Sequence, residues 1–216
     1  MLTRPFSLKP LCLAALLCAA GAAQADITVY RSESAFLAAV SAPGVDSFDD
    51  LSAATPYADT LYRTAGAYTY QAYSTGGLWG AGGGGDQWLS NTFQTAPIVF
   101  SGFSPGVTAF GGRFFATDVF GDYLPAGNLM LTAVDGTALT YSLEGAATDS
   151  FLGFVSDSAL YTVVLGANGG EEYWPTANDV VLAVPEPTTY GMLLAGVGVL
   201  GLAARRRQAP AARAAA

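Results

Sequence analysis

Short runs of aromatic and β-branched residues, separated by Gly, Pro, Asn and Asp, dominate the sequence from residue 45 to residue 184. Within the runs, apolar residues alternate with polar ones, which is the pattern of strands with one buried face. About ten such strands without a long helix predict an all-β fold, an antiparallel β-sandwich or jelly roll. The expected strands cover residues 45–48, 68–73, 88–93, 98–103, 107–116, 128–134, 137–143, 151–155, 160–165 and 180–184.

Three local patterns add detail to this sandwich. Ser32 is placed to cap one short N-terminal helix that ends before Pro43-Gly44. The dipeptide Asp135-Gly136 suits a two-residue type I′ turn, and predicts a hairpin over residues 128–143. Residues 76–86 contain seven glycines and one tryptophan, so we expect a mobile surface loop there.

The N-terminal residues have the features of a secretory signal peptide. A basic start and an apolar run over residues 11–20 precede Ala23-Gln24-Ala25, in which Ala23 and Ala25 fit a signal peptidase site. Passage through the translocation machinery and cleavage there would remove residues 1–25. Both cysteines of the chain lie in this segment, so the mature protein is expected to contain neither disulfides nor thiols.

The C-terminal region contains a second apolar segment. Residues 188–204 are uncharged, and as a helix they would span about 25 Å, slightly less than a hydrocarbon core of about 30 Å. Arg205, Arg206 and Arg207 follow and are expected to remain cytoplasmic, which leaves residues 26–187 on the other side of the membrane. One interpretation is a plain tail anchor preceded by prolines that stiffen a linker.

A second interpretation rests on the order of three features: Pro185-Glu186-Pro187, the Gly-rich apolar segment, and the cluster of arginines. Together they resemble the PEP-CTERM sorting signal of Gram-negative bacteria, whose tail is also called the ice-binding protein C-terminal domain. The resemblance implies recognition by an exosortase, removal of the tail near Pro185-Glu186-Pro187, and a setting of exopolysaccharide production and biofilm. The Ala-rich residues 208–216 extend beyond the family pattern and are expected to be a disordered tail.

The charge of residues 26–184 restricts the choice of partner. These 159 residues contain three arginines, sixteen carboxylates, and neither Lys nor His, which gives a net charge of −13. Nucleic acid is excluded as a partner because neutralising phosphates requires a basic surface. Cations and neutral sugars remain compatible with this charge, as does a purely solubilising role for the acids.

The same composition excludes most catalytic chemistry. Without His, Cys or Lys, the exported segment cannot form a Ser-His-Asp triad, a thiol nucleophile, a lysine base or a His-ligated zinc site. Carboxylates alone remain, and a glycoside hydrolase needs two of them across a cleft. We therefore expect a protein that is not an enzyme, with a carboxylate-dependent glycan hydrolase as an alternative.

Carboxylates also make calcium the favoured metal, because Ca²⁺ prefers six to eight oxygen ligands. Asp49 and Asp50 lie near the start of the fold and Asp179 on its last strand. First and last strands of a jelly roll are often neighbours, so the three could form a structural calcium site. The alternative is that they are turn and strand-edge residues that face water.

Aromatic residues in Gly-, Pro- and acid-rich surroundings suggest a sugar-binding surface. Trp79 lies in the Gly-rich segment, and Tyr173 and Trp174 form a second group in an expected loop. Flat rings with one polar edge stack on sugars at little entropic cost. The alternative is that these rings belong to the core of the sandwich.

The predicted organisation has four parts: a signal peptide over 1–25, an exported β-sandwich over 26–184, a sorting signal over 185–207, and the tail over 208–216. The middle part is also similar to lectin-like or carbohydrate-binding-module-like jelly-roll passengers of PEP-CTERM proteins. That similarity implies a non-catalytic surface or matrix protein associated with exopolysaccharide. A structural matrix protein without a ligand remains an alternative.

Overall fold

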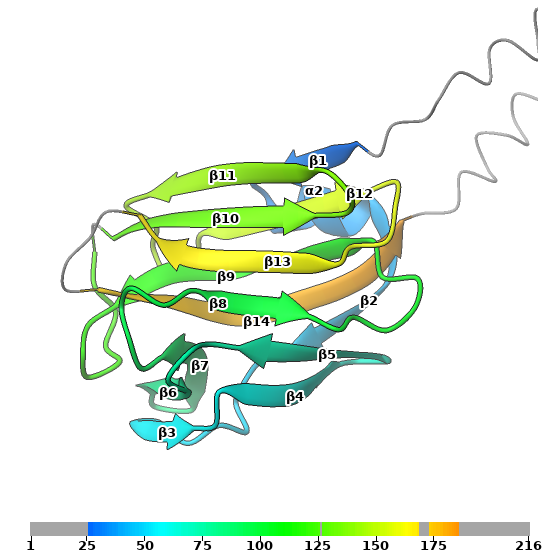
Figure 1. The fold of residues 1–216 in the computed structure, drawn as a ribbon. Coiled ribbons are helices and arrows are strands. Elements are labelled where there is room, and N and C mark those ends of the chain that lie inside the picture. The colour runs from blue at the N-terminus through cyan, green and yellow to red at the C-terminus, as the bar shows by residue number, and fades with distance from the viewer. Residues whose placement is uncertain (1–25, 126, 169–172, 186–216) are drawn as a thin grey trace, which may run out of the picture.

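The short apolar runs form two antiparallel sheets that face each other (Figure 1). A computed structural model describes residues 26–125, 127–168 and 173–185. The eight-stranded sheet has the order β1 (Ile27–Tyr30), β12 (Phe151–Ser156), β9 (Ala109–Thr117), β14 (Trp174–Pro185), β7 (Asp86–Asn91), β6 (Leu78–Gly83) and β3 (Thr55–Tyr57), with β2 (Val40–Asp46) also paired to β14. The six-stranded sheet has the order β11 (Ala138–Glu144), β10 (Asn128–Val134), β13 (Thr162–Ala167), β8 (Ile98–Ser101), β5 (Tyr68–Tyr73) and β4 (Thr60–Ala65).

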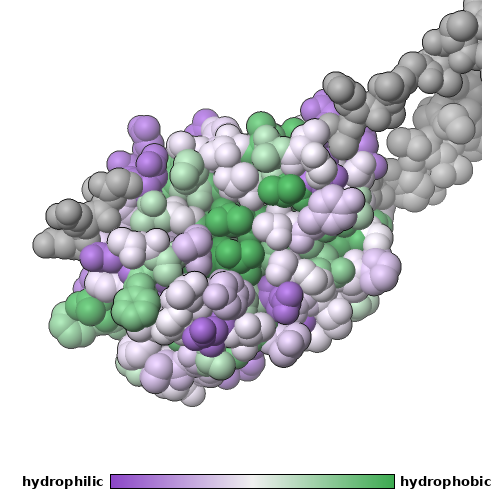
Figure 2. All heavy atoms as spheres, in the orientation of Figure 1, coloured by the Kyte–Doolittle hydropathy of each residue, from purple (hydrophilic) through white to green (hydrophobic). Residues whose placement is uncertain are grey.

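The predicted antiparallel sandwich with one short N-terminal helix is therefore confirmed. From β7 onward the chain moves between the two sheets at almost every connection, as in jelly rolls. The core between the sheets consists of the inward-facing residues of both, among them Phe100 of β8 and Phe110 of β9, whose ring centroids lie 5.0 Å apart. The solvent face of the six-stranded sheet mixes polar and apolar residues, with one apolar area near its centre (Figure 2).

The outer face of the eight-stranded sheet is covered at one end by the helix α2 (Glu33–Ala38). As expected, Ser32 caps it, with its hydroxyl accepting from the backbone N–H of Ala35 at 3.4 Å. The helix ends at Ala38, before the expected Pro43-Gly44, because the chain enters β2 at Val40. Phe36 is fully buried and packs on the outer side chains of β9, β12 and β14.

A loop of residues 118–123 crosses the other end of the same face. Asp118 stabilises it, since its Oδ1 accepts from the backbone N–H of Phe120 at 2.8 Å and of Asp122 at 3.0 Å. The loop is tied to the sheet because Gly82 of β6 donates its N–H to the carbonyl of Gly121 at 3.0 Å. The side chains that line the pocket described below lie between this loop and the strands.

The expected mobile loop over residues 76–86 is wrong, because this segment forms β6 and the turn into β7. Two of its glycines have a structural reason: Gly80 is required by close packing, and Gly82 by its backbone conformation. A Cβ on Gly80 would lie 2.1 Å from the carbonyl oxygen of Ser52, and Gly82 has a φ of 81°. Strands β3 and β4 were also missed by the sequence pattern.

The hairpin of β10 and β11 is present, but its turn differs from the prediction. Val134 pairs with Ala138, so three residues connect the strands, and of these only Gly136 has a positive φ, at 117°. The expected two-residue type I′ turn needs positive φ at two positions. Asp135 instead accepts from the backbone N–H of Thr137 at 3.0 Å, which closes the turn through a side chain.

Both predicted targeting segments, the signal peptide and the apolar helix over 188–204, lie outside the described residues. Within the described ranges, no helix has the length and hydropathy required to cross a membrane.

Candidate functional site: a pocket between two tryptophans

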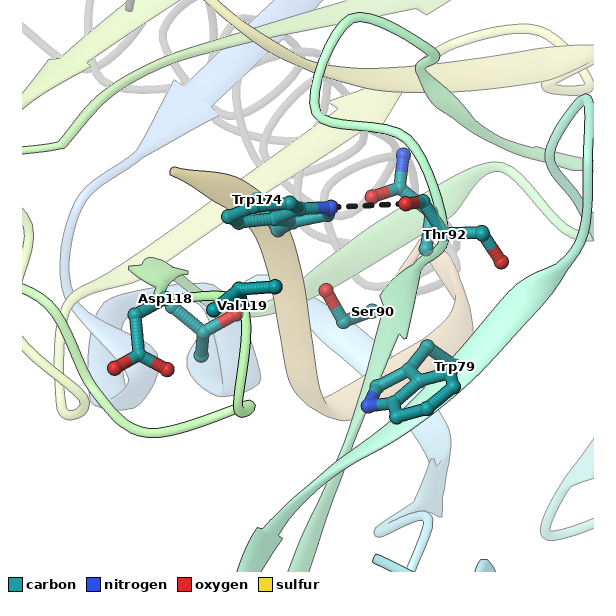
Figure 3. A pocket seen from close by; sticks show the side chains of 8 residues that line it. Trp79, Ser90, Thr92, Asp118, Val119 and Trp174 are labelled. Carbon is teal, nitrogen blue, oxygen red and sulfur yellow. Dashed lines mark hydrogen bonds between the residues drawn. The ribbon is translucent and has the colours of Figure 1, made fainter. Parts of the chain in front are cut away.

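One end of the eight-stranded sheet carries a pocket of about 220 Å³ on its outer face. It lies where β6, β7, β9 and β14 run side by side and the loop 118–123 begins. Figure 3 shows Trp79 and Trp174 on opposite sides of it, with Ser90 between them. The lining residues are Trp79, Ser90, Asn91, Thr92, Thr117, Asp118, Val119 and Trp174.

Strand register brings the two tryptophans together. Trp79 of β6 is the partner of Ser90 of β7, and Trp174 of β14 is the partner of Thr117 of β9. Strands β7 and β14 are neighbours in the sheet, so the two indoles stand on the same outer face. Both rings are half-buried. Trp174 is held in place because its Nε1–H donates to the carbonyl of Thr92 at 3.1 Å.

The floor of the pocket is a chain of hydroxyl groups. Thr176 Oγ1 lies 3.1 Å from Ser90 Oγ, to which it donates, and 2.8 Å from Thr117 Oγ1. Ser90 donates in turn to the carbonyl of Pro175 at 3.2 Å. These side chains are buried, so their mutual hydrogen bonds satisfy groups that water cannot reach.

Asn91 lines the pocket, and its side chain has a buried acceptor without a partner among the described residues. Its amide nitrogen donates to the carbonyl of Ala96 and to Ser74 Oγ, which identifies the other amide atom as Oδ1. Within the part of the chain that the structure describes, this Oδ1 is buried and has no hydrogen-bond partner. A buried acceptor left unpaired is costly, and an ordered water is a common partner for such a group.

Charge in the pocket comes from one side chain. Asp118 lies in its wall, and none of the described residues that line it is basic. The arginines of the eight-stranded and six-stranded sheets, Arg113 and Arg63, are paired with carboxylates elsewhere. The pocket is therefore aromatic and polar, with negative charge on one side.

The sequence placed Trp79, Trp174 and Tyr173 together as candidate glycan contacts, and the structure brings only the tryptophans together. Tyr173 is 8% exposed, and its hydroxyl lies 2.7 Å from the carbonyl of Asn128 and 3.0 Å from that of Asn168. The ring packs in the core, so the expectation that Tyr173 faces a glycan is corrected.

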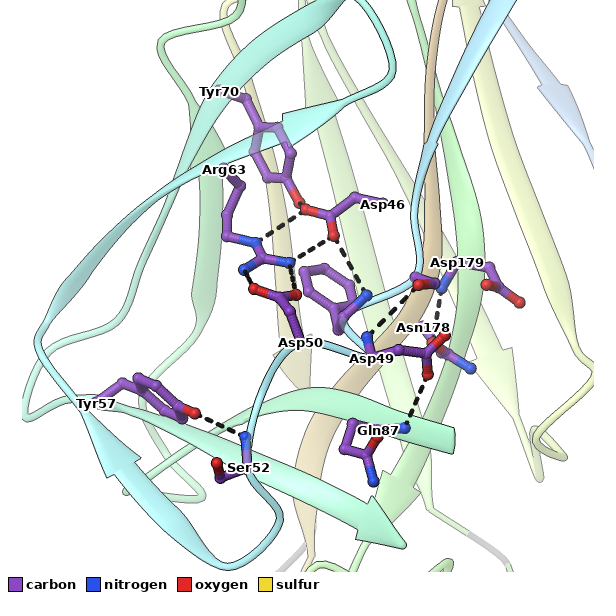
Figure 4. A network of polar contacts seen from close by, with 12 residues as sticks. Asp46, Asp49, Asp50, Ser52, Tyr57, Arg63, Tyr70, Gln87, Asn178 and Asp179 are labelled. Carbon is purple, nitrogen blue, oxygen red and sulfur yellow. Dashed lines mark hydrogen bonds and ion pairs between the residues drawn. The ribbon is translucent and has the colours of Figure 1, made fainter. Parts of the chain in front are cut away.

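The three aspartates predicted to bind calcium are divided between separate contacts (Figure 4). Both carboxylate oxygens of Asp50 lie 2.7 Å from nitrogens of Arg63, and Asp179 Oδ2 lies 2.6 Å from Arg113 Nη1. Asp49 Oδ1 accepts from the backbone N–H of Gln87 at 3.3 Å. Among the described residues, no three acidic side chains are grouped to hold a metal ion, so the predicted calcium site is not assembled.

Arg63 instead organises a buried polar network. It donates from Nε and Nη2 to Asp46 at 2.9 and 2.6 Å, while Tyr70 donates its hydroxyl to Asp46 at 2.7 Å. The hydrogen bonds from Arg63 hold the pKa of Asp50 below its ordinary value. Burial, together with the Asp46 charge, raises the pKa of the Tyr70 hydroxyl. The network is saturated and joins β2 to β4 and β5, which gives it a structural role.

Asp179 occupies an unusual position beside Arg113. It lies at an irregularity in β14, with a φ of 47°, where the pairing with β9 shifts register between Asn178 and Val181. Burial raises the pKa of Asp179, and nearby Asp86, Glu33 and Asp49 act in the same direction against the opposing effect of Arg113. Glu33 of α2 also pairs with Arg113 at 3.1 Å, so this cluster links the helix to the sheet.

Sequence reasoning missed Asn91, Ser90 and Thr117 as members of the site. They are ordinary polar residues at strand ends, and only the pairing of β7 with β6 and of β9 with β14 brings them to the pocket. Asp118 is distant in sequence from both Trp79 and Trp174, so nothing in the sequence connects it with them.

Fold and pocket together define the described part of the chain as an antiparallel β-sandwich with an aromatic pocket on one outer face. At the C-terminal end, residues 183–207 match the PEP-CTERM protein-sorting motif. This confirms the resemblance carried by Pro185-Glu186-Pro187 and by Arg205, Arg206 and Arg207. The motif indicates a protein that is exported and held in the membrane by its C-terminal end before processing.

Two solved structures resemble the sandwich. One is TmCBM61, solved in complex with beta-1,4-galactotriose, with 10% identity, a TM-score of 0.33, and coverage of 52% of this chain and 86% of that one. The other is the CBM22-1 xylan-binding domain from Paenibacillus barcinonensis Xyn10C, with 13% identity, a TM-score of 0.34, and coverage of 69% and 98%. At these TM-scores the likeness does not locate a binding site. No curated protein matches the chain.

Proposed function

We propose that this chain is an exported, non-catalytic protein that binds a glycan in the Trp79–Trp174 pocket and is sorted by its C-terminal motif. The observation that carries the proposal is the pair of half-buried indoles on opposite sides of one pocket with a hydroxyl floor. Indole faces stack on the C–H face of a sugar ring, while polar groups between them take its hydroxyls.

The carboxylates support binding without hydrolysis. Hydrolysis of a glycosidic bond needs two carboxyl groups about 5 to 9 Å apart across the bound sugar. Asp118 is the one carboxylate among the described residues that line the pocket, and its Oδ1 already accepts two backbone N–H groups. A glycan hydrolase would have to use a different surface.

The sorting part of the proposal concerns the two ends of the chain. Signal peptidase would cut after Ala25, and an exosortase would process the tail near Glu186, releasing the sandwich to the cell surface or matrix, where exopolysaccharide is the expected ligand. Replacing Glu186 with Ala should block processing in a host with the matching exosortase. If the Glu186→Ala variant has the same mature C-terminus and the same surface retention as the wild type, the tail is only a membrane anchor and not a sorting signal.

Glycan binding is tested with the full chain purified in detergent and titrated with the producer's exopolysaccharide and with soluble neutral glycans. We expect a change in tryptophan fluorescence and retention on immobilised polysaccharide, each lost in Trp79→Ala and Trp174→Ala. Tyr161→Ala is the matched control, because Tyr161 is 64% exposed and does not line the pocket. Failure of the wild-type protein to bind any of these glycans would favour a structural matrix protein without a ligand.

A further inference from the structure

We infer that the pocket accepts a single uncharged sugar residue, at the end or on a branch of a glycan, and rejects acidic sugars such as uronates. This inference rests on the proposed glycan-binding function, and it concerns which sugar the same pocket takes. Three independent properties of the pocket carry it: the direction of its hydrogen bonds, its charge and its size.

The hydroxyl chain at the floor can direct all of its protons to acceptors of the protein. The carbonyl of Pro175 can only accept, so Ser90 gives its proton to that carbonyl. Thr176 has one proton, which it directs to Ser90 Oγ at 3.1 Å or to the carbonyl of Trp174 at 3.4 Å. Either hydroxyl can donate across the 2.8 Å contact between Thr117 and Thr176, and when Thr176 gives its proton to one of those two acceptors, Thr117 is the donor. All three protons are then used within the protein.

The remaining polar groups of the wall extend this bias toward acceptors. Asp118 carries a carboxylate, which can only accept. Asn91 Oδ1 is buried and does not reach a ligand in the pocket. The Trp174 indole N–H is already given to Thr92, so it cannot serve a ligand. At the rim, the indole N–H of Trp79 and the hydroxyl of Thr92 suit a sugar hydroxyl as well as a carboxylate. The groups that can distinguish a neutral sugar from an acidic one are therefore acceptors. They require a ligand that donates hydrogen bonds, as sugar hydroxyls do.

Charge acts in the same direction. A uronate in the pocket would bring a second carboxylate close to Asp118, with no basic residue among the described residues of the lining. Arg113 is held by Glu33 and Asp179, and Arg63 by two other carboxylates, so neither is free to turn toward the ligand. A desolvated charge without a partner costs affinity, which is how a site excludes the wrong ligand.

Size restricts how much of a glycan can enter. About 220 Å³ is below the range of roughly 300 to 1,000 Å³ typical of pockets for drug-sized ligands. The space is bounded by Trp79 on one side, Trp174 on the other, and the start of the loop at Asp118 and Val119 (Figure 3). One pyranose ring fits these dimensions, and neighbouring sugars of a chain would lie outside.

The test compares three kinds of probe by fluorescence titration of the full chain: methyl glycosides of neutral hexoses and pentoses, the matching uronic acids, and neutral trisaccharides. We expect at least one neutral glycoside to bind, its trisaccharide to bind within about threefold of it, and the matching uronic acid to bind at least about tenfold more weakly, a difference of about 1.4 kcal/mol or more.

Asp118→Asn checks the cause of the selectivity, because asparagine keeps an oxygen for the backbone N–H groups of Phe120 and Asp122. The ratio of neutral to uronic affinity should fall several-fold in this variant. Asp122→Asn is the matched control, since Asp122 is exposed, belongs to the same loop and does not line the pocket. The control should keep the wild-type ratio.

The possible results distinguish a failure of the proposed sugar selectivity from a failure of glycan binding itself. A protein that binds neutral trisaccharides but no neutral monosaccharide glycoside, or that binds uronates as tightly as neutral sugars, would be a glycan binder without the proposed selectivity. A wild-type ratio in Asp118→Asn would remove the charge explanation and overturn that part of the inference. Binding of no probe at all would overturn the proposed function together with the inference.

Discussion

Thr176 and Thr117 place their hydroxyl oxygens 2.8 Å apart across the pairing of β14 with β9, beneath the tryptophan pocket. Thr176 also reaches Ser90 on β7, so one side chain joins three adjacent strands. Thr176→Val keeps the shape of the side chain and removes its hydroxyl. The buried hydroxyls of Ser90 and Thr117 then lose the partner that they share. We expect a loss of about 1 to 2 kcal/mol in the free energy of unfolding, measured by denaturant titration.

Thr108→Val is the matched control for that substitution. Thr108 Oγ1 is buried and, within the described ranges, has no hydrogen-bond partner. Removing an unpaired buried hydroxyl should leave stability unchanged or raise it slightly. If Thr176→Val and Thr108→Val lose equal free energy of unfolding, the hydrogen bonds of the hydroxyl chain do not contribute to stability.

Gly80→Ala tests whether the glycines of β6 are there for close packing. The added Cβ would lie 2.1 Å from the carbonyl oxygen of Ser52, so the backbone must shift next to Trp79. We expect a loss of about 1 to 3 kcal/mol in unfolding free energy and weaker glycan binding. Gly83→Ala is the control in the same strand, because its Cβ would meet no atom within 4 Å and its φ is not positive. Similar stability of the two variants would contradict the packing explanation.

Asp50 should make the protein sensitive to acid. Its pKa in the folded state is lowered from the ordinary value of 3.8, mainly by hydrogen bonds from Arg63. The stabilisation is therefore present above the ordinary pKa and is lost as the pH falls through the folded-state pKa. Melting temperatures between pH 2 and pH 7 should show a shallower loss below about pH 4 in Asp50→Asn than in the wild type.

Asp59→Asn provides the comparison for the pH series, because Asp59 is also exposed but belongs to no ion pair among the described residues. Its acid profile should follow that of the wild type. If the melting temperature of Asp50→Asn falls with pH as steeply as that of the wild type below about pH 4, other carboxylates cause the loss of stability in acid.

The sorting motif begins within the folded sheet. The match starts at residue 183, yet Val184 pairs with Ser41 and Pro185 pairs with Val40. A peptidase that binds an unpaired segment of chain at this point can act only after the end of β14 has separated locally from β2. Inserting eight Gly and Ser residues between Val184 and Pro185 should speed processing, measured as the rate at which the shortened protein appears in a host with the exosortase.

The control insertion places the same eight residues after Gly136, in the exposed turn between β10 and β11. It lengthens the chain without separating the motif from the sheet, so processing should keep its original rate. If both insertions process at the original rate, opening of β14 does not limit the reaction.

Much of the sandwich was predictable because period-2 alternation is a local property. Strands such as β10 and β12 have clear alternating or aromatic runs, and their bounds differ by at most one residue from the expected ones. Strand β6 was hidden because its glycines serve contacts with Ser52 and with the loop 118–123, both distant in sequence. The Gly-rich composition of such a segment predicts a loop.

The site was predictable only in part for a similar reason. Trp79 and Trp174 could be selected by their surroundings, but their convergence depends on the sheet order β14-β7-β6, which long-range pairing decides. The calcium expectation failed because it counted aspartates and did not anticipate where the two arginines would lie. Arg63 and Arg113 compensate Asp50 and Asp179, so both carboxylates are occupied within the protein.

Strand β14 connects the pocket to the sorting motif in one element, with an irregularity at Asp179. It begins at Trp174, ends at Pro185, and at about 3.3 Å per residue covers about 35 Å. It is paired with β9 on one side, and with β7 and β2 on the other. A pull between a sugar held at Trp174 and a tail held in the membrane would act along this strand. Its ladders would then be loaded in shear, with many hydrogen bonds sharing the force at once, and the sandwich would resist being peeled apart one bond at a time.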